Sequence, residues 1–220
     1  MLQHYEIISL RQWLSALALV TVVVIISFYW LDRPLALLMQ NQLSHSTRRV
    51  AGPLTYIDNP LVWIAVITFV VLGIIGLTGR PLSKLRSVIL FCSLSLIVVE
   101  TIKNQIKFVF GRTWPETWYK NNPSFIHDGV YGFNWFHAGQ AYQSFPSGHM
   151  AATCAIVAVI WVYYPRLRFI YSAIVLAVLI GLLGTNFHFL SDCIAGAFLG
   201  TSVGLMTSKL LGSLQQLRQG

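Results

Sequence analysis

Residues 13–30, WLSALALVTVVVIISFYW, form an apolar stretch without a charged side chain. A helix needs about 20 mostly apolar residues to cross a hydrocarbon core roughly 30 Å thick, so this stretch predicts a membrane-spanning helix. It is longer than the apolar region of a typical secretory signal peptide, and no small-residue cleavage site follows it. We therefore expect it to be a retained membrane span.

The composition of the chain agrees with a membrane location. Of its 220 residues, 55% are hydrophobic and 10% are charged, whereas soluble domains carry about 25% charged residues. This excludes a disordered chain and disfavours a soluble globule, because so apolar a surface must lie in something other than water. The formal net charge of +8 suits an anionic bilayer or a phosphate-bearing ligand. No basic cluster supports a nucleic-acid partner.

Five further apolar stretches predict additional spans, which gives an all-α integral membrane bundle of six transmembrane helices in a single domain, residues 1–220. The further stretches are 61–77, 87–99 with a charged continuation, 147–164, 169–187 and 193–211. Three glycines at four-residue spacing in the last stretch predict a small-residue face, which we expect to pack within this chain rather than between chains. These glycines are Gly196, Gly200 and Gly204.

The short basic loops predict the orientation. Lysine and arginine residues at 80–86 and 166–168 share one side of the predicted bundle with both termini, and this side should be cytoplasmic. The long connection 111–146 lies on the opposite side and is rich in aromatic residues and glycine. Connections of this length are usually functional or disordered. Its composition is not typical of disorder, so we expect it to fold over a pocket or against the bilayer interface.

The charged continuation of the third span is the first of three polar motifs on that opposite side. Lys103 and Lys107 lie four residues apart and share a helix face. Glu100 can pair with Lys103, and we expect Lys103 and Lys120 to reach the headgroups as long cations usually do. For Lys107 and Arg112, the two motifs that follow favour a role in a site.

The second motif, FPSGH at 145–149, predicts a helix start with Ser147 as the N-cap. Unpaired N–H groups and the helix dipole make such an end an anion site, and Gly148 lets a ligand approach the backbone. His149 would then stand in the first turn, beside the anion. The alternative is a plain helix cap with an interfacial histidine.

The third motif lies between the last two spans, where His188 and Asp192 are four residues apart. On a helix, the carboxylate can fix the tautomer of the imidazole and leave its other nitrogen free as a nucleophile. The alternatives are a pair that only ties two helices together, or a metal site that borrows His127 or His137 from the long connection. No metal-binding spacing is present, so we expect no metal and no cofactor.

Together the three motifs resemble those of the type-2 phosphatidic acid phosphatase superfamily of integral membrane phosphatases. The family pattern is Lys-x6-Arg-Pro, then Pro-Ser-Gly-His, then Ser-Arg-x5-His-x3-Asp. The second motif is complete at 146–149, and His-x3-Asp is complete at 188–192. The motif core is 103–192. Both arginines of the family pattern are absent from this chain. Counted from Lys107, the position of the first arginine holds Trp114, and counted back from His188, the position of the second holds Leu182.

The resemblance implies metal-independent hydrolysis of a lipid phosphate or lipid diphosphate through a phosphohistidine. His188 would be the nucleophile, Asp192 its orienting carboxylate, and His149 the acid that protonates the leaving oxygen. The phosphoryl oxygens would be bound by Lys107, Arg112, Ser147 and Gly148. The implied location is a bacterial inner membrane, with the site on the periplasmic face.

Three alternatives remain open, and the absence of the two family arginines supports the first. One is a non-catalytic membrane protein of the same fold that binds an anionic lipid headgroup. Another is a lipid phosphotransferase, in which a second lipid replaces water. A transporter has less support, because Glu100 is the one ionisable residue that falls well inside a predicted span.

Overall fold

The computed structural model describes residues 9–42, 58–118 and 120–217, in which every regular element is a helix apart from isolated β-bridges. The elements are Leu10–Ile26 (α1), the π-helical turn Ser27–Leu31 (η1), Asp32–Gln42 (α2), Asp58–Leu77 (α4), Lys84–Phe110 (α5), Phe125–Asp128 (α6), the 3₁₀ turn Gln140–Tyr142 (η3), Gly148–Tyr163 (α7), the 3₁₀ turn Pro165–Leu167 (η4), Arg168–Gly184 (α8) and Leu190–Leu217 (α9). The predicted all-α membrane fold is confirmed.

Five helical stretches in the described part of the chain are long and apolar enough to cross a membrane: Leu10–Gln42, Pro60–Leu77, Lys84–Phe110, Pro165–Gly184 and Leu190–Ser213. The predicted fourth span is instead the 16-residue helix α7, which is about 24 Å long at 1.5 Å per residue. Ser147 caps its start and Pro165 follows its end, so the helix is not extended in either direction. Six full-length spans are therefore not confirmed, since α7 falls short.

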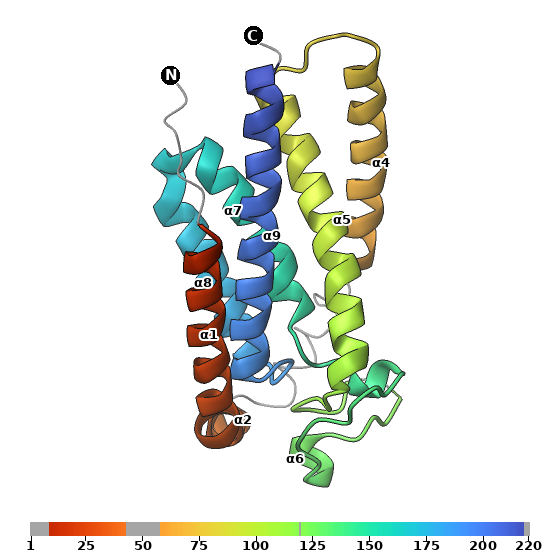
Figure 1. The fold of residues 1–220 in the computed structure, drawn as a ribbon. Helices are drawn as coiled ribbons and strands as arrows, with labels where there is room; N and C mark the ends of the chain where they lie inside the picture. The colour runs from red at the N-terminus through yellow and green to blue at the C-terminus, as the bar shows by residue number, and fades with distance from the viewer. Residues whose placement is uncertain (1–8, 43–57, 119, 218–220) are drawn as a thin grey trace.

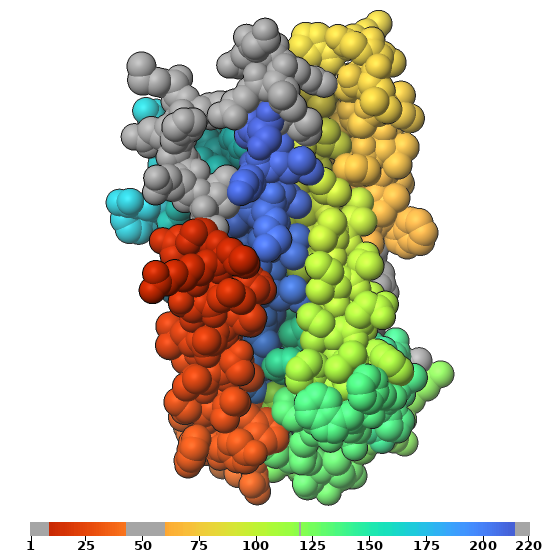
Figure 2. All heavy atoms as spheres, in the orientation of Figure 1, coloured from red at the N-terminus to blue at the C-terminus, as the bar shows by residue number. Residues whose placement is uncertain are grey.

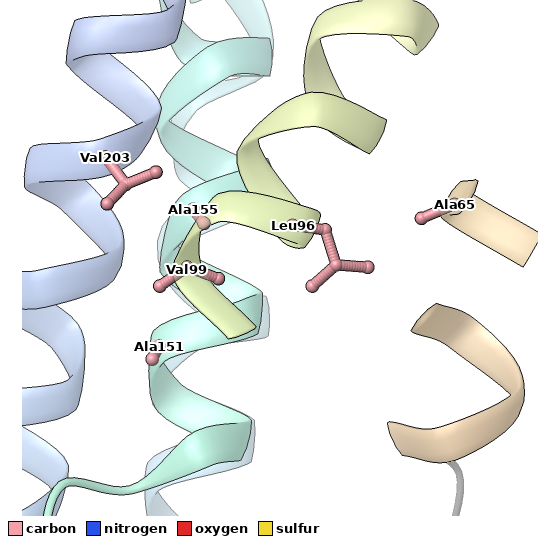
Figure 3. Packing of buried hydrophobic residues seen from close by; sticks show 6 residues of the cluster. All are labelled: Ala65, Leu96, Val99, Ala151, Ala155 and Val203. Atoms are coloured by element: carbon pink, nitrogen blue, oxygen red, sulfur yellow. The ribbon is translucent and has the colours of Figure 1, made fainter. Parts of the chain in front are cut away.

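Helix α7 lies in the centre of the bundle, packed against both α5 and α9 (Figure 1). One core cluster joins these three helices to α4 (Figure 3); it consists of Ala65, Leu96, Val99, Ala151, Ala155 and Val203. The predicted glycine face of α9 makes the closest approach. A Cβ atom at Gly200 would lie 2.1 Å from the carbonyl oxygen of Ala151. Only glycine allows the two backbones to touch, so this face packs within the chain as expected.

Residues 111–146 close the end of the bundle where the C-terminus of α5 meets the N-termini of α7 and α9 (Figure 1). Aromatic rings hold this covering segment to η1. Tyr131 and Phe133 both stack on Phe28, with ring centroids 4.8 and 5.1 Å away. The segment leaves α5 at Gly111, where φ is 51° and a Cβ atom would lie 1.8 Å from the carbonyl oxygen of Asn134. The segment is thus folded and packed over the helix ends.

An apolar cavity of about 640 Å³ lies between α1, α5 and α9. Figure 2 shows this face, with α9 visible between the two other helices. Trp13, Ile106 and Phe198 contribute to the lining, and Phe133 and Trp135 of the covering segment contribute from the helix ends. Phe145 and Pro146 of the second motif also line the cavity, whereas His149 and His188 do not.

Candidate active site

The second motif forms the predicted helix start. Ser147 is the N-cap of α7, and its Oγ accepts a hydrogen bond from the Met150 N–H at 3.4 Å. The Ser147 N–H donates to the carbonyl oxygen of Asp192 at 3.0 Å, which fixes the start of α7 against the start of α9. The N–H groups of the first turn therefore point to the closed end of the bundle, where they favour an anion.

The third motif brings His188 and Asp192 together, but not as two positions on one helix. His188 lies before α9, which begins at Leu190. Asp192 Oδ2 accepts hydrogen bonds from the Phe189 N–H at 3.0 Å and from Ser144 Oγ at 2.6 Å. The same oxygen lies 3.6 Å from His188 Nδ1. The carboxylate thus faces Nδ1 and leaves Nε2 as the nitrogen available for chemistry.

The two histidines of the motifs are neighbours. The ring centroids of His149 and His188 are 6.2 Å apart, with an interplanar angle of 64°. Phe187 packs against both rings, at 5.4 and 5.3 Å between centroids. Reacting atoms in an enzyme complex approach to about 3–3.5 Å. The separation therefore suits a small tetrahedral group held between the two imidazoles.

Burial determines the protonation of His188. Its side chain is almost fully enclosed, and this burial lowers the pKa of His188 to about 4. Asp192 opposes the shift, whereas the charges of Lys107 and His149 add to it. The imidazole is therefore neutral at physiological pH, which is the state a nucleophile requires.

The structure corrects the expectation for Lys103. Its side chain does not reach the headgroups but is only 6% exposed, and its Nζ lies 2.7 Å from Glu100 Oε1. A Cβ atom on Gly148 would lie 2.7 Å from the same Nζ, so this ammonium group sits beside the start of α7. Lys107 is also buried, with its Nζ 5.7 Å from the ring centroid of Trp114. Lys103 is thus the lysine at the helix start, and Lys107 acts electrostatically on His188.

Arg112 lies behind Asp192 and is completely buried. One terminal nitrogen, Nη1, donates to Asp192 Oδ1 and to Ser191 Oγ. The other, Nη2, donates to Asp32 Oδ2 at 2.7 Å and to the Tyr131 hydroxyl at 3.1 Å. Both terminal nitrogens are engaged by protein acceptors, whereas the buried Nε has no hydrogen-bond partner among the described residues. Contact between Arg112 and a phosphoryl oxygen stays a prediction.

Asp32 is the functional candidate that the sequence analysis missed. The first predicted span ended at Trp30, but the helical stretch continues through η1 into α2 as far as Gln42. Asp32 therefore lies within a membrane-spanning stretch, where it is 1% exposed. The signal was present in the sequence, because an acidic residue beside a long apolar run needs a buried partner. What the sequence did not show was that the partner is Arg112.

The two histidines of the covering segment lie elsewhere. His127 is exposed and pairs with Asp128 at 2.9 Å, which raises the pKa of His127. His137 is also exposed and stacks on Tyr142, with centroids 3.9 Å apart. Among the described residues, no three His, Cys, Asp or Glu side chains are arranged as metal ligands. The second and third motifs instead bring together His149, His188 and Asp192.

Comparison with known proteins agrees with this geometry. Residues 88–215 match the PAP2 superfamily, and this region is more than half of the chain. The chain belongs to the PAP2 superfamily. Among solved structures, the crystal structure of the first transmembrane PAP2 type phosphatidylglycerolphosphate phosphatase from Bacillus subtilis matches with a TM-score of 0.53 and 15% identity. The match covers 91% of this chain and 96% of that one, and at this identity it shows a shared fold.

Two relatives are similar to part of this PAP2 protein. They are lipid A 1-phosphatases of Rhizobium johnstonii and Rhizobium etli, each 34% identical over 110 residues. The alignments cover 49% of this chain and 41% and 43% of the two relatives. The chain therefore matches less than half of the length of these relatives.

The structure explains how this PAP2 protein accommodates its two departures from the family motifs. Trp114 packs against the His188 ring at 5.1 Å between centroids, and its indole N–H donates to the carbonyl oxygen of Gln140 at 2.7 Å. Leu182 is buried in a core cluster with Met150 and Cys193. Trp114 is thus part of the surroundings of His188, and Leu182 belongs to the apolar core.

Proposed function

We propose that this protein is a membrane phosphatase that hydrolyses a lipid phosphate or lipid diphosphate through a phosphohistidine on His188. The observation that carries this proposal is a buried imidazole of depressed pKa, backed by a carboxylate at Nδ1 and placed 6.2 Å from a second imidazole. A protein that only binds headgroups has no need of an oriented, neutral nucleophile. Membership of a phosphatase superfamily supports the same conclusion.

The reaction has two steps. In the first, Nε2 of His188 forms a bond to phosphorus while the bond from phosphorus to the leaving oxygen breaks, and His149 gives its proton to that oxygen. Asp192 stabilises the positive charge that develops on His188. In the second step, His149 takes a proton from water, the resulting hydroxide attacks phosphorus, and the phosphorus–nitrogen bond breaks to release phosphate.

The phosphoryl oxygens need positive groups in both steps, because phosphoryl transfer is catalysed mainly by positioning and charge. In this proposal Lys107 and the N–H groups that begin at Gly148 supply them, with Ser147 as the N-cap of the turn. Arg112, whose Nε has no hydrogen-bond partner among the described residues, is proposed to join them. The proposal includes independence of metal ions, since these groups belong to the chain itself.

The proposed substrate is a lipid because the site lies at the ends of membrane-spanning helices, under an aromatic segment of the type found at headgroup depth. The named activities of the relatives, on lipid A and on phosphatidylglycerolphosphate, fit this class. The basic loops at the other end of the bundle support a site on the periplasmic face of an inner membrane.

The test is phosphate release by the purified protein from lipid phosphates, lipid diphosphates and a water-soluble phosphomonoester, with and without a chelator. We expect release from a lipid that the chelator does not reduce, and its loss in His188→Ala and His149→Ala. Brief reaction with ³²P-labelled lipid should leave an acid-labile label on the wild type. Wild-type turnover in His188→Ala would contradict the proposal, and inactivity of the wild type on every lipid would favour the headgroup-binding alternative.

A further inference from the structure

A buried cation lies between two buried carboxylates at the back of the site. Arg112 binds Asp192 with one terminal nitrogen and Asp32 with the other, and all three side chains are enclosed by protein. Ser191 links the outer members, because its Oγ accepts from Arg112 and donates to Asp32, and its backbone N–H donates to Asp32 Oδ1 at 2.9 Å. We refer to Asp32, Arg112 and Asp192 as the charge triad.

The charges of the triad bear on the catalytic carboxylate. Asp192 is useful to His188 only while its negative charge is available to the imidazole. Arg112 alone would neutralise that charge in a site of low effective dielectric, where ion pairs are strong. Asp32 offers the same guanidinium a second carboxylate. With two aspartates and one arginine, the triad has a formal charge of −1.

We propose that Asp32 is a positioning residue that balances the charge of Arg112, so that Arg112 can hold Asp192 in place without cancelling the negative charge that His188 needs. This inference rests on the proposed function, because it assigns Asp32 a part in the phosphohistidine chemistry of His188. It gives the N-terminal helical stretch a direct role in the site, although that stretch contains none of the family motifs.

Hydrogen bonds from other parts of the chain hold the buried Asp32 side chain in place. The Tyr131 hydroxyl donates to the carbonyl oxygen of Phe28 at 2.6 Å and lies 3.2 Å from Asp32 Oδ2. The covering segment therefore locks η1 and the start of α2 onto the site. Because the Ser191 N–H also donates to Asp32, the start of α9 is bound to the same carboxylate. The side chain of Asp32 is thus held from two sides, by the covering segment through Arg112 and Tyr131 and by the start of α9 through Ser191.

The groups that face His188 define what a change at Asp32 should do. They are Asp192 from α9, Lys107 from α5 and His149 from α7. Asp192 favours the imidazolium, and the other two disfavour it. In the Asp32→Asn variant, Asp192 is the one carboxylate left to neutralise Arg112. The attraction between Asp192 and the imidazolium form of His188 is therefore weaker. The pKa of His188 should fall further, and the positively charged transition state should be less stable.

The experiment compares Asp32→Asn with Asp32→Glu and with a control, Asp128→Asn, which removes an acidic side chain from the exposed part of the covering segment. We expect Asp32→Asn to lower kcat by about 10- to 100-fold, the usual loss when a residue that orients a directly acting side chain is replaced. KM should change by less than about threefold, and the acidic limb of the pH profile should move to lower pH. Asp32→Glu should restore the limb, and Asp128→Asn should match the wild type. A folded Asp32→Asn variant with the kcat of the wild type and the same acidic limb of the pH profile would overturn the inference.

A second comparison decides the matter if Asp32→Asn does not fold. The double variant Asp32→Asn/Arg112→Gln has the same formal triad charge as the wild type, whereas Arg112→Gln alone leaves two facing carboxylates. We expect the double variant to be at least as active as Arg112→Gln. A further tenfold loss in the double variant would overturn the inference, because Asp32 would then act without the arginine that it balances. Both comparisons require a wild type whose activity is lost in His188→Ala. Failure of the proposed function would therefore appear in that first assay, separately from failure of the inference about Asp32.

Discussion

Asp192 binds Arg112 through Oδ1 and faces His188 with Oδ2. The two oxygens of one carboxylate therefore serve different partners, a permanent cation on one side and an imidazole that changes its charge on the other. Ser144 and the Phe189 N–H complete the surroundings of Oδ2, at 2.6 and 3.0 Å. Because Oδ1 binds Arg112 and Oδ2 faces His188, the buried carboxylate is held in a fixed position and can still stabilise a positive charge on His188.

The acidity of His188 predicts the pH profile. Its folded pKa of about 4 lies below the ordinary value of about 6.5, so the neutral, reactive form persists to unusually low pH. We expect kcat/KM for lipid phosphate to rise with pH through about 4. Each sample should be assayed again at pH 7 after exposure to acid, which separates titration from unfolding. An acidic limb near 6.5 would mean that His188 is solvated or is not the nucleophile.

The position of Lys103 predicts a role in binding the anion. We expect Lys103→Met to lower kcat/KM by about tenfold or more, which corresponds to loss of one charge-assisted hydrogen bond. Because this change strands Glu100, the double variant Glu100→Gln/Lys103→Met should show the same loss with better folding. Lys120→Met, an exposed lysine of the covering segment, is the matched control. Full activity in the folded double variant would remove Lys103 from the site.

The first residue of α7 predicts a loss of activity without a loss of fold. A methyl group at Gly148 would meet the tip of the Lys103 side chain, which can swing aside, rather than a rigid backbone atom. Gly148→Ala should therefore displace the ammonium group and obstruct the helix start, lowering kcat/KM by about tenfold while thermal unfolding stays close to wild type. In Gly181→Ala the new methyl meets nothing within 4 Å, and both quantities should be unchanged.

The contact between α7 and α9 predicts the opposite behaviour for Gly200. Its added Cβ would lie 2.1 Å from a backbone oxygen, which cannot swing aside. We expect Gly200→Ala to destabilise the protein by about 1–3 kcal/mol, the usual cost of overpacking a core. Thermal unfolding in detergent measures this against Gly212→Ala, which lies in the same helix with nothing within 4 Å of the new methyl. Equal stability of the two variants would show that the helices can separate at no cost.

Local sequence was sufficient for much of the molecule. Apolar runs predict the membrane helices, because a lipid environment leaves a helix as the only way for such a segment to satisfy its backbone. Ser147 predicts the start of α7, because capping depends on neighbours within three residues. The spacing of His188 and Asp192 predicted their contact, although the carboxylate meets the ring through a turn before α9 rather than along one helix face.

The sequence by itself thus determined the membrane class and the all-α architecture, and it predicted the motif residues that the structure brings together, since each depends on short-range patterns or a complete motif. Only the tertiary structure decided that Lys103 is buried beside Gly148 and that Arg112 is shared by Asp32 and Asp192. Asp32 and Asp192 are 160 positions apart in the chain. Charges at such a distance are brought together by helix packing and by the covering segment, and no spacing rule along the chain encodes that encounter.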